Sequence, residues 1–426
     1  MHKRLIHKIL GALTLALLSV PATQAFSPSH YATESRLSSG RWVKIAIPED
    51  GVYELTPAEL LEMGFSDPSA VRVYGAGGHM IGEVLDGSVM DDVQPVPSAV
   101  INDKLCFYAL GSVSFTMAYP RKAANRRYSR VVNTYSTRGY YFLTDDNSEM
   151  KPITKISPVG TATAVVHDRS FTKFYHENEL LSVSQTGKDM LGEKMENGTI
   201  TIDYSMPGLI PQDTVMVNVC LAGIMNESAG YINAKLNGTD RAPFMSMDAI
   251  IYIPASGEVY YNTKSPSAIV VPTVHNENGT LTAYITQTSG SIKASYLDYV
   301  ILTYRHYNDM ANAVDGQLNM GVPDLVTGDC VKLAGANAST VVWNVTNPKA
   351  PIEMTLIRDD ESQFAFRAET DYADAEYVAF NPSTTLRKID AWEEVPNQNL
   401  HAAATPDLLI ITNKNLLPQA ERLAQP

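Results

Sequence analysis

The sequence predicts a mainly β protein made of tandem antiparallel β-sandwich-like domains, and three observations support that fold class. Many short runs alternate apolar and polar residues with period two, as strands with one buried face do. Turn residues separate these runs, and the pairs Asn197-Gly198, Asn237-Gly238 and Asn278-Gly279 suit tight hairpin turns. Helical periodicity is sparse. Together these features favour antiparallel sandwiches.

The expected strands share this alternation, and the turn residues that bound them set their ends. They are WVKIAI, VRVYG, GYYFLT, GTITIDYSM, TVMVNVCLAG, YINAKLNG, ASYLDYVILTYRHY, STVVWNVT, IEMTLIR, QFAFRAE and EYVAF. One helix is expected in TPAELLEMGF, because Thr56 suits an N-cap, Pro57 the first helical position and Gly64 the C-terminal end. A second short helix is expected within HENELLSVSQTGKDMLGEKM.

Composition narrows the class of protein. The chain has 426 residues, of which 45% are hydrophobic and 19% charged, as in packed globular proteins. The formal net charge of -13 and the lack of a basic stripe argue against a nucleic-acid partner.

The N-terminus predicts export. A basic start at His2, Lys3 and Arg4 precedes the apolar core Ile9–Val20, and small residues around Ala25 form a cleavage site, which is the pattern of a secretory signal peptide. The apolar core is well short of the roughly 20 residues that a transmembrane helix needs. No later segment is apolar enough to span a bilayer, so no transmembrane segment is expected after cleavage.

The end of the chain predicts a different kind of fold. Leu408–Ile411 is a continuous apolar run, typical of a strand buried on both faces in a parallel sheet. Apolar residues then recur at helical spacing behind Pro418. A strand followed by a helix needs further parallel strands to cover both, so we expect an incomplete α/β domain here, with the apolar run exposed.

Changes in pattern suggest where domains begin and end. Weakly patterned segments near residues 160, 310 and 395 are the expected boundaries. The expected parts are a signal peptide (1–25), an N-terminal β domain (26–160), a β-sandwich domain (161–310), a further β subdomain (311–395) and the start of an α/β domain (396–426).

No catalytic, cofactor-binding or metal-binding residue is assigned from the residues alone. Cys106, Cys220 and Cys330 are too few for a disulfide framework, and we interpret them as small buried hydrophobes rather than reactive thiols. The histidines form no zinc motif, and no nucleophile-elbow motif is present. We therefore expect no metal and no cofactor.

Two further motifs have structural interpretations. The glycine-rich YGAGGHM lacks the spacing and the following helix of a phosphate loop, so a hairpin that needs positive φ angles is favoured. The acidic clusters Asp91-Asp92, Asp145-Asp146 and Asp359-Asp360-Glu361 lack the alternating ligands and glycine bend of a calcium loop.

Several longer stretches of the sequence resemble segments of one protein family, and they occur in the same order as in that family. They are SGRWVKIAIPEDGVYELTPAELLEMGF, VRVYGAGGHM, NTYSTRGYYFLTD, FYHENELLSVSQTGKDMLGEKM, ASYLDYVILTYRHY, VVWNVTNPKAP and VPNQNLHAAATPDLLIITNKNLLPQAERLA. From about Gly40 to its last residue, the chain resembles the N-terminal part of the PorU-type sortases of the Bacteroidetes type IX secretion system.

The resemblance implies a fold and an activity for a complete protein. In that family, β domains precede a gingipain-like cysteine peptidase domain of caspase type, which begins where TPDLLIIT stands here. A complete sortase removes the C-terminal signal of cargo proteins and attaches them to surface lipopolysaccharide by cysteine-dependent transpeptidation. The implied partners are cargo proteins and other proteins of the attachment complex, and the implied location is the periplasm or the outer-membrane cell surface.

The resemblance assigns no catalytic residue to this chain. His401 precedes the first strand of the expected α/β domain and so does not occupy the position of the catalytic histidine. None of the three cysteines lies in that domain. Two alternatives therefore stay open beside the sortase hypothesis: an exported β-rich binding module or scaffold without peptidase activity, and a surface adhesin.

Overall fold

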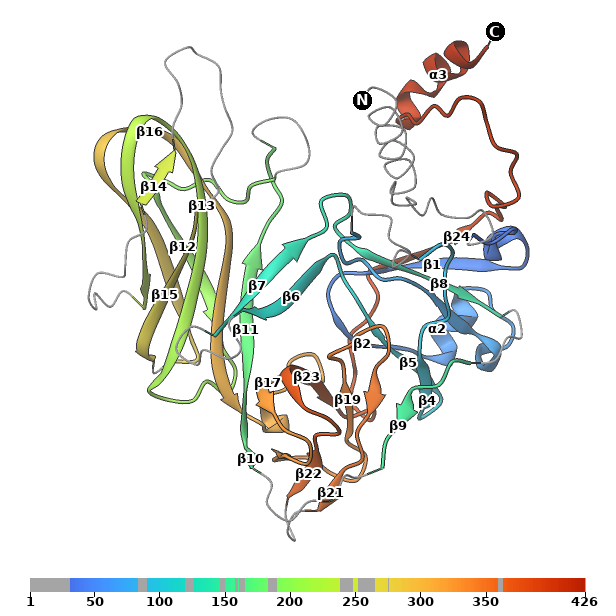
Figure 1. The fold of residues 1–426 in the computed structure, drawn as a ribbon, viewed down its shortest axis with the longest axis horizontal. Helices are drawn as coiled ribbons and strands as arrows, with labels where there is room; N and C mark the ends of the chain where they lie inside the picture. The colour runs from blue at the N-terminus through green and yellow to red at the C-terminus, as the bar shows by residue number, and fades with distance from the viewer. Residues whose placement is uncertain are drawn as a thin grey trace, which may run out of the picture. The chain divides into compact units, whose positions relative to one another are not determined.

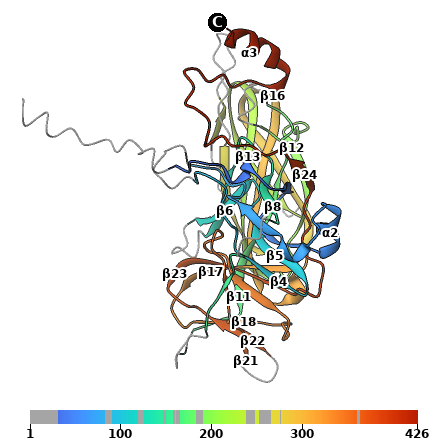
Figure 2. The same cartoon turned by 90° about the vertical axis from the view of Figure 1, so that its right-hand side faces the viewer.

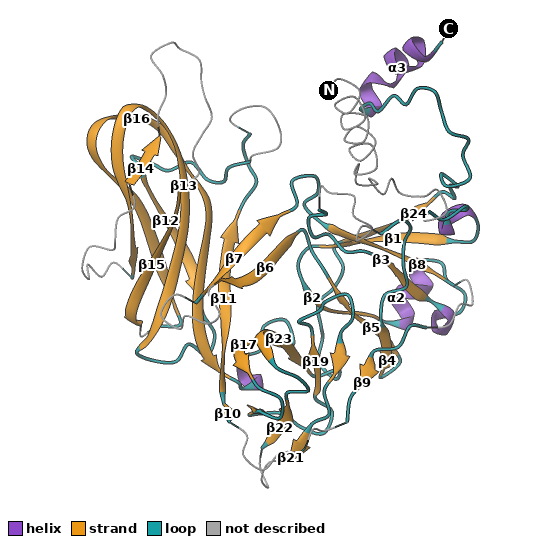
Figure 3. Cartoon of the chain, in the orientation of Figure 1, coloured by secondary structure: helices purple, strands orange, loops and turns teal. Residues whose placement is uncertain are grey.

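The structure is a computed structural model, which describes residues 31–82, 90–118, 126–145, 150–157, 160, 165–182, 190–237, 248–251, 265–274, 276–358 and 363–425. The expected signal peptide lies outside the described residues. The chain divides into two compact units. The larger unit comprises Val43–Ile81 and Gln94–Val395, and the smaller unit comprises Met1–Trp42, Gly82–Val93 and Pro396–Pro426. Strands dominate the larger unit (Figure 3), which confirms the mainly β fold class.

The first part of the larger unit contains two sheets around one short helix. A four-stranded sheet has the order β24-β1-β8-β3, and a three-stranded sheet has the order β2-β5-β4. The strands are β1 (Trp42–Ile47), β2 (Gly51–Leu55), β3 (Arg72–Gly75), β4 (Ser98–Ile101), β5 (Lys104–Ala109), β8 (Gly139–Thr144) and β24 (Ala391–Val395). Apolar side chains of β1, β3 and β8 pack against those of β2, β5 and the helix in one core.

The helix α2 (Pro57–Glu62) has the ends that the sequence predicts. The Thr56 side chain accepts a hydrogen bond from the Glu59 N–H at 3.2 Å, and Glu59 Oε2 accepts one from the Thr56 N–H at 2.7 Å. This capping box satisfies two backbone groups that the helix cannot pair internally. Gly64, just beyond the helix, has φ of 89°, a conformation that glycine adopts without steric cost.

Strands β2 and β5 are buried on both faces, although alternation predicts only one buried face for most strands. One face packs on the core just described, and the other packs on Trp343, Val378 and Phe380. All five residues of β2 are therefore buried, including the charged Glu54.

The middle of the larger unit is built on two very long strands, β13 (Asp213–Leu236) and β16 (Asn278–Tyr307). They pair antiparallel over most of their lengths, with register irregularities near the middle of β13. Figure 2 shows them running beside β12. The other strands of this part are β10 (Val166–His167), β11 (Arg169–Glu177), β12 (Thr199–Ser205), β14 (Asp248–Ile251) and β15 (Ser265–Val274).

The continuity of β13 corrects one expectation. The runs TVMVNVCLAG and YINAKLNG are predicted as separate strands, but both belong to β13, because pairing with β16 continues on each side of the irregular segment. β-Bulges accommodate such changes of register without ending a strand. Side chains from β12, β13 and β16 enclose one hydrophobic core.

The last part of the larger unit contains β17 (Gln317–Leu325), β18 (Cys330–Leu333), β19 (Val341–Asn344), β20 (Ile352–Glu353), β21 (Ile357–Arg358), β22 (Phe364–Arg367) and β23 (Tyr372–Phe380). The run IEMTLIR is predicted as one strand, but β20 and β21 join different sheets. Between them Met354 is buried in the local core.

The sheets connect parts of the sequence that are far apart (Figure 1). Strand β11 pairs with β16 along its length and with β17 at Phe171, and short β9 (Thr154–Lys155) pairs with β20. The strands β6 (Val113–Ala118) and β7 (Arg127–Val132) form a two-stranded hairpin. The expected domain boundaries near residues 160, 310 and 395 stay predictions.

The Asn-Gly pairs differ in whether they form the predicted hairpin turn. Asn197 and Gly198 have φ of 50° and 71° and close a tight turn between Glu196 and Thr199, as predicted. Asn278-Gly279 instead begins β16 and pairs with the end of β12. A Cβ on Gly279 would lie 1.8 Å from Asn237 Oδ1, so the glycine permits a close approach rather than a turn. Gly238 lies outside the described residues.

The described residues of HENELLSVSQTGKDMLGEKM are extended, and the expected second helix stays a prediction for the rest of the segment. This segment begins in β11, and Leu181 then forms an antiparallel bridge with Leu191. Backbone hydrogen bonds to a facing segment hold both ends extended. Residues 183–189 lie outside the described part.

In the smaller unit, polar side chains fix the chain around the 3₁₀ helix η2 (Arg36–Ser38). Asn397 donates to the Leu37 and Gly40 carbonyls, both at 3.0 Å, and Asn399 Oδ1 accepts from the Ser35 N–H at 2.9 Å. The chain ends in η6 (Lys414–Leu416) and α3 (Leu417–Ala424), which confirms the expected terminal helix with Pro418 in its first turn.

The apolar run before α3 is exposed, as the sequence predicts, but it does not form the predicted strand. Leu408, Leu409 and Ile411 are 67%, 71% and 89% exposed. Residues 408–411 are assigned to no strand. A strand needs a neighbour to pair its backbone, and none of the described strands pairs with this run.

Candidate functional site

The cysteines occupy buried positions. Cys106, Cys220 and Cys330 each lie on a strand and are at most 3% exposed, which confirms their interpretation as buried residues. Burial, together with the nearby Glu54 carboxylate, raises the pKa of the Cys106 thiol to about 12. A thiol with this pKa is protonated at neutral pH and is a poor nucleophile.

Most described histidines lie beside carboxylates. His79 Nε2 is 2.9 Å from both carboxylate oxygens of Asp50, His167 Nε2 is 3.0 Å from Asp329, and His176 Nε2 is 2.8 Å from Glu193. His401 Nδ1 is 3.9 Å from Asp91 within the smaller unit. These contacts join segments that are separated in the sequence and have a structural role.

His306 lies in a buried polar network with Ser170 and Asn308. His306 Nε2 is 3.2 Å from Ser170 Oγ and 3.1 Å from the Asn319 carbonyl, and Ser170 Oγ donates to Asn308 Oδ1 at 2.6 Å. Burial lowers the pKa of His306 to about 4, so the ring is neutral at physiological pH. All three hydrogen-bonding side chains are at most 2% exposed, so this network has no access for a substrate.

A pocket of about 1080 Å³ lies where β7 and the following loop meet the end of β11. The lining is mixed in character, with polar backbone, tyrosine rings and charged groups. It comprises Pro48, Ser112, Val113, Arg130, Val131, Val132, Asn133, Thr134, Tyr135, Ser136, Thr137, Arg138, Tyr140, Tyr175, Glu177, Asn178, Glu179, Leu180 and Met190.

Arg130 organises the charges at this pocket. Its guanidinium forms an ion pair with Glu177, lies 3.2 Å from Asp298 Oδ2 and stacks 4.0 Å from the centre of the Tyr299 ring. The Tyr175 hydroxyl also donates to Glu177. Burial raises the pKa of Glu177 to about 7, although the Arg130 guanidinium opposes this rise.

The β6–β7 hairpin is anchored to the strands beneath it by a second group of polar contacts. The Tyr128 hydroxyl donates to Glu376 Oε1 at 2.8 Å, and Lys173 Nζ lies 4.2 Å and 4.6 Å from the ring centres of Phe115 and Tyr128. Burial raises the pKa of Glu376 to about 7 and lowers that of Lys173. These contacts fix β7 next to the pocket.

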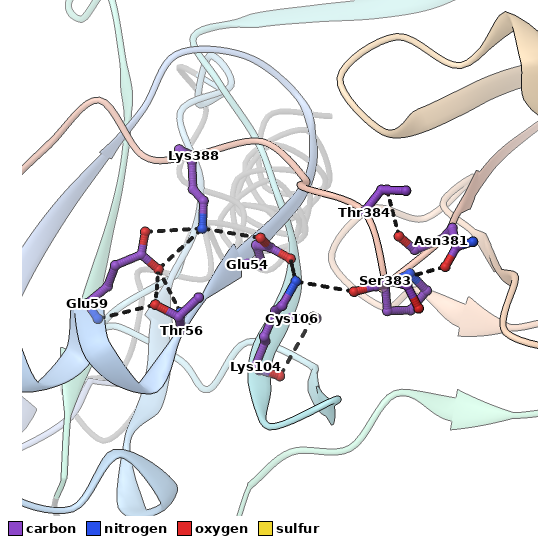
Figure 4. Close-up of polar contacts among 10 residues, drawn as sticks. Glu54, Thr56, Glu59, Lys104, Cys106, Asn381, Ser383, Thr384 and Lys388 are labelled. Carbon is purple, nitrogen blue, oxygen red and sulfur yellow. Dashed lines mark hydrogen bonds and ion pairs between the residues drawn. The ribbon is translucent and has the colours of Figure 1, made fainter.

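A further network of charges surrounds the buried Glu54 (Figure 4). Lys104 Nζ donates to one of its carboxylate oxygens at 2.8 Å, and Lys388 Nζ lies 3.2 Å from the other. Lys388 also lies 3.1 Å from Glu59, and Lys104 donates to the Pro382 carbonyl at 3.2 Å. The network ties β2, β5 and α2 to residues 382–388 and has a structural role.

The remaining motifs have structural roles too. After β3, Gly75 and Gly77 have φ of 148° and 85°, and residues 76–82 contain no helix, which confirms a turn rather than a phosphate loop. Asp91 and Asp92 accept hydrogen bonds from the Ala32 and Arg36 backbone. Asp146 and Asp359-Asp360-Glu361 lie outside the described residues.

The described part of the chain lacks both a metal-binding cluster and a membrane-spanning helix. Within it, no three or more His, Cys, Asp or Glu side chains gather where they could hold a metal ion. In the same residues, no helix has both the length and the apolar character needed to cross a membrane.

The pocket is the site that sequence reasoning missed. Its residues come from β7, the loop before β8 and the end of β11, and only the folded structure brings them together. The phrases NTYSTRGYYFLTD and FYHENELL, which carry the family resemblance, overlap it.

Comparison with known proteins gives one informative match. No family model and no curated protein sequence matches the chain. The crystal structure of dimeric latent PorU from Porphyromonas gingivalis superimposes with a TM-score of 0.76 and 26% sequence identity, over 93% of this chain. The chain spans 37% of that structure's length. A match to infectious bursal virus derived T=1 particles has a TM-score of only 0.20 at 9% identity, over 90% of this chain and 70% of that one.

The PorU match agrees with the resemblance seen in the sequence phrases. It covers nearly the whole chain with a similar fold. The chain is therefore PorU-like in fold over nearly its whole length.

Proposed function

We propose that this chain is the non-catalytic, β-rich portion of a type IX sortase. A complete protein of this kind would remove the C-terminal signal of cargo proteins and attach them to surface lipopolysaccharide by cysteine-dependent transpeptidation. The observation that carries the proposal is the match to PorU over 93% of this chain and 37% of that structure. The chain would be exported and would act in the periplasm or at the outer-membrane surface.

The buried thiols support the non-catalytic part of this proposal. A cysteine peptidase needs an accessible thiolate beside a base, but all three cysteines are buried, and the Cys106 thiol is protonated at neutral pH. The exposed apolar run at 408–411 supports a connection to further structure, because a parallel sheet would cover it. The partners would be cargo proteins with C-terminal signal domains and other proteins of the attachment complex.

Sequencing the gene beyond codon 426 in the native strain tests this proposal. The expected result is an open frame that encodes alternating strands and helices, with a histidine and later a cysteine at strand ends. A stop codon with no such segment nearby would overturn it and leave the stand-alone binding module as the better function. Fractionation of the same strain should find the chain in the periplasm or at the cell surface, and a cytoplasmic chain would contradict the proposed export.

A further inference from the structure

The β6–β7 hairpin packs against the eleven-stranded sheet without joining it. Among the described strands, β6 and β7 pair only with each other. Side chains of the sheet hold the hairpin backbone instead: the Tyr128 N–H donates to Thr303 Oγ1 at 2.9 Å, and the Tyr128 carbonyl accepts from Asn218 Nδ2 at 3.1 Å. Asp374 Oδ2 likewise accepts from the Met117 N–H at 3.2 Å. Because no ladder of backbone hydrogen bonds joins the two, the hairpin can leave the sheet as a unit.

The interface beneath the hairpin buries charged groups beside apolar ones. Met117 and Tyr128 of the hairpin pack against Ile301 of β16 in a small apolar cluster. Next to it, Glu376 Oε1 accepts a hydrogen bond from the Tyr128 hydroxyl at 2.8 Å, and Lys173 Nζ lies 4.6 Å from the centre of the Tyr128 ring. Buried charges cost free energy that apolar side chains of similar size do not. The hairpin is therefore held less firmly than an apolar interface of the same size would hold it.

Three buried polar atoms at this interface form no hydrogen bond with the described residues. They are Arg130 Nε, Asn218 Oδ1 and Asp374 Oδ1. A buried polar atom without a partner disfavours the state that buries it, and water satisfies the atom when the site opens. All three atoms therefore favour lifting of the hairpin.

The charge on Glu376 makes the closed position depend on pH. Burial raises the pKa of this carboxyl to about 7; the Lys173 ammonium opposes the rise, the Asp374 carboxylate adds to it, and the hydrogen bond from Tyr128 opposes it. A carboxyl whose pKa is raised by burial stabilises the closed state when it is protonated. This contribution is complete below about pH 4.5 and is lost as the pH rises through about 7.

Four other titratable groups lie near Glu376. Burial also raises the pKa of Asp374, so this carboxyl acts in the same direction. Burial raises the pKa of Tyr128 and of Tyr108 well above 10, so both stay neutral near pH 7. Lys173 acts in the opposite direction, because burial lowers its pKa and favours its neutral form. A comparison of wild type with a Glu376 variant isolates the carboxyl, because Lys173 is present in both proteins.

Cys220 lies on the face of the sheet that the hairpin covers. Asn218 donates to the Tyr128 carbonyl, and Cys220, two residues further along β13, points to the same face. Its partner in register, Tyr299, stacks with the Arg130 guanidinium of the hairpin at 4.0 Å. Cys220 is 1% exposed with the hairpin in place. Lifting of the hairpin would uncover this thiol.

We propose that the β6–β7 hairpin is a pH-dependent flap, which closes on the sheet when Glu376 is protonated, lifts as this carboxyl loses its proton, and thereby uncovers Cys220. The lack of strand pairing permits the motion, and the buried carboxyl beneath Tyr128 couples it to pH. This inference goes beyond the proposed sortase function and requires no peptidase domain. The two proposals therefore fail separately.

The rate at which iodoacetamide labels Cys220 in the whole folded chain measures opening of the flap. Wild type and Glu376→Gln are compared at pH 6, 7 and 8, and peptide mass spectrometry locates the label. Glutamine keeps an acceptor for the Tyr128 hydroxyl but cannot ionise, and the ratio of the two rates cancels the intrinsic pH dependence of the thiol. We expect the wild-type rate, divided by the variant rate, to rise about tenfold between pH 6 and pH 8, as for one carboxyl that regains its ordinary pKa on opening. A ratio that does not change with pH overturns the proposal.

The other two cysteines distinguish lifting of the flap from unfolding. Cys106 on β5 and Cys330 on β18 are buried away from the hairpin, and their labelling should stay slow at each pH. If both are labelled in step with Cys220, the whole chain opens and the flap is wrong.

A second variant tests the contact that closes the flap. Tyr128→Phe removes the hydroxyl that binds Glu376, so it should speed labelling of Cys220 at pH 6 at least about threefold. Tyr135→Phe, at a side chain that is 80% exposed in the loop after β7, is the matched control and should leave the rate unchanged. Equal rates for Tyr128→Phe and wild type would contradict the proposed closing contact.

Discussion

Replacement of Glu177 by glutamine should change how stability depends on pH. Its side chain is only 5% exposed, and burial raises its pKa from an ordinary 4.5 to about 7. A carboxyl group whose pKa rises on folding stabilises the folded state when it is protonated. Its contribution is complete below about pH 4.5 and is lost as the pH rises through about 7. At about 1.4 kcal/mol per pKa unit, the full loss is about 3 kcal/mol.

Urea unfolding at pH 5, 6, 7 and 8 measures this effect. Glutamine mimics the protonated carboxyl, so Glu177→Gln should resemble the wild type at pH 5 and exceed its unfolding free energy by up to about 3 kcal/mol at pH 8. Glu62→Gln, on the exposed face of α2, is the matched control and should keep the wild-type pH dependence. A Glu177→Gln variant that loses stability between pH 5 and 8 as steeply as the wild type would refute the reasoning.

Three other predictions concern the fold. Thr56→Ala should lower the unfolding free energy by about 1 kcal/mol in urea titrations, because it removes the capping box of α2, and Thr56→Ser should restore most of this loss. Trp343→Ala should cost about 3 to 5 kcal/mol by the same assay, since the indole is fully buried and its ring centre lies 4.8 Å from that of Phe380; a cost below about 1 kcal/mol would contradict that packing. Cys106 should react with iodoacetamide only after unfolding, as followed by mass spectrometry, because burial holds its thiol protonated, and rapid labelling of the native chain would show that it is accessible.

Local patterns in the sequence determined most of the secondary structure. Alternation located strands such as β1, β8 and β19, and the residues Thr56, Pro57 and Gly64 defined the ends of α2. These predictions succeed because capping, turn geometry and side-chain alternation depend on neighbours a few residues apart. The mainly β class follows directly from them.

Pairing between distant segments decided structural features that the local sequence pattern does not predict. Whether Asn278-Gly279 turns or begins a strand depends on Asn237, whose side chain occupies the space beside the glycine. The burial of Glu54 likewise depends on Lys104 and Lys388, which lie far from it in sequence. Sequence alone carries no signal of such partners, since a charged residue in a strand normally faces water.

The same contrast applies to the site and to the end of the chain. The sequence by itself determined the family resemblance and the exposure of Leu408–Ile411 when no neighbouring strand is present. Only the tertiary structure decided that β7 and β11 enclose a pocket with Arg130 and Glu177 in contact. A pocket forms where backbone edges and charges from separate strands converge, and that convergence is fixed by the packing of whole sheets rather than by any local run of residues.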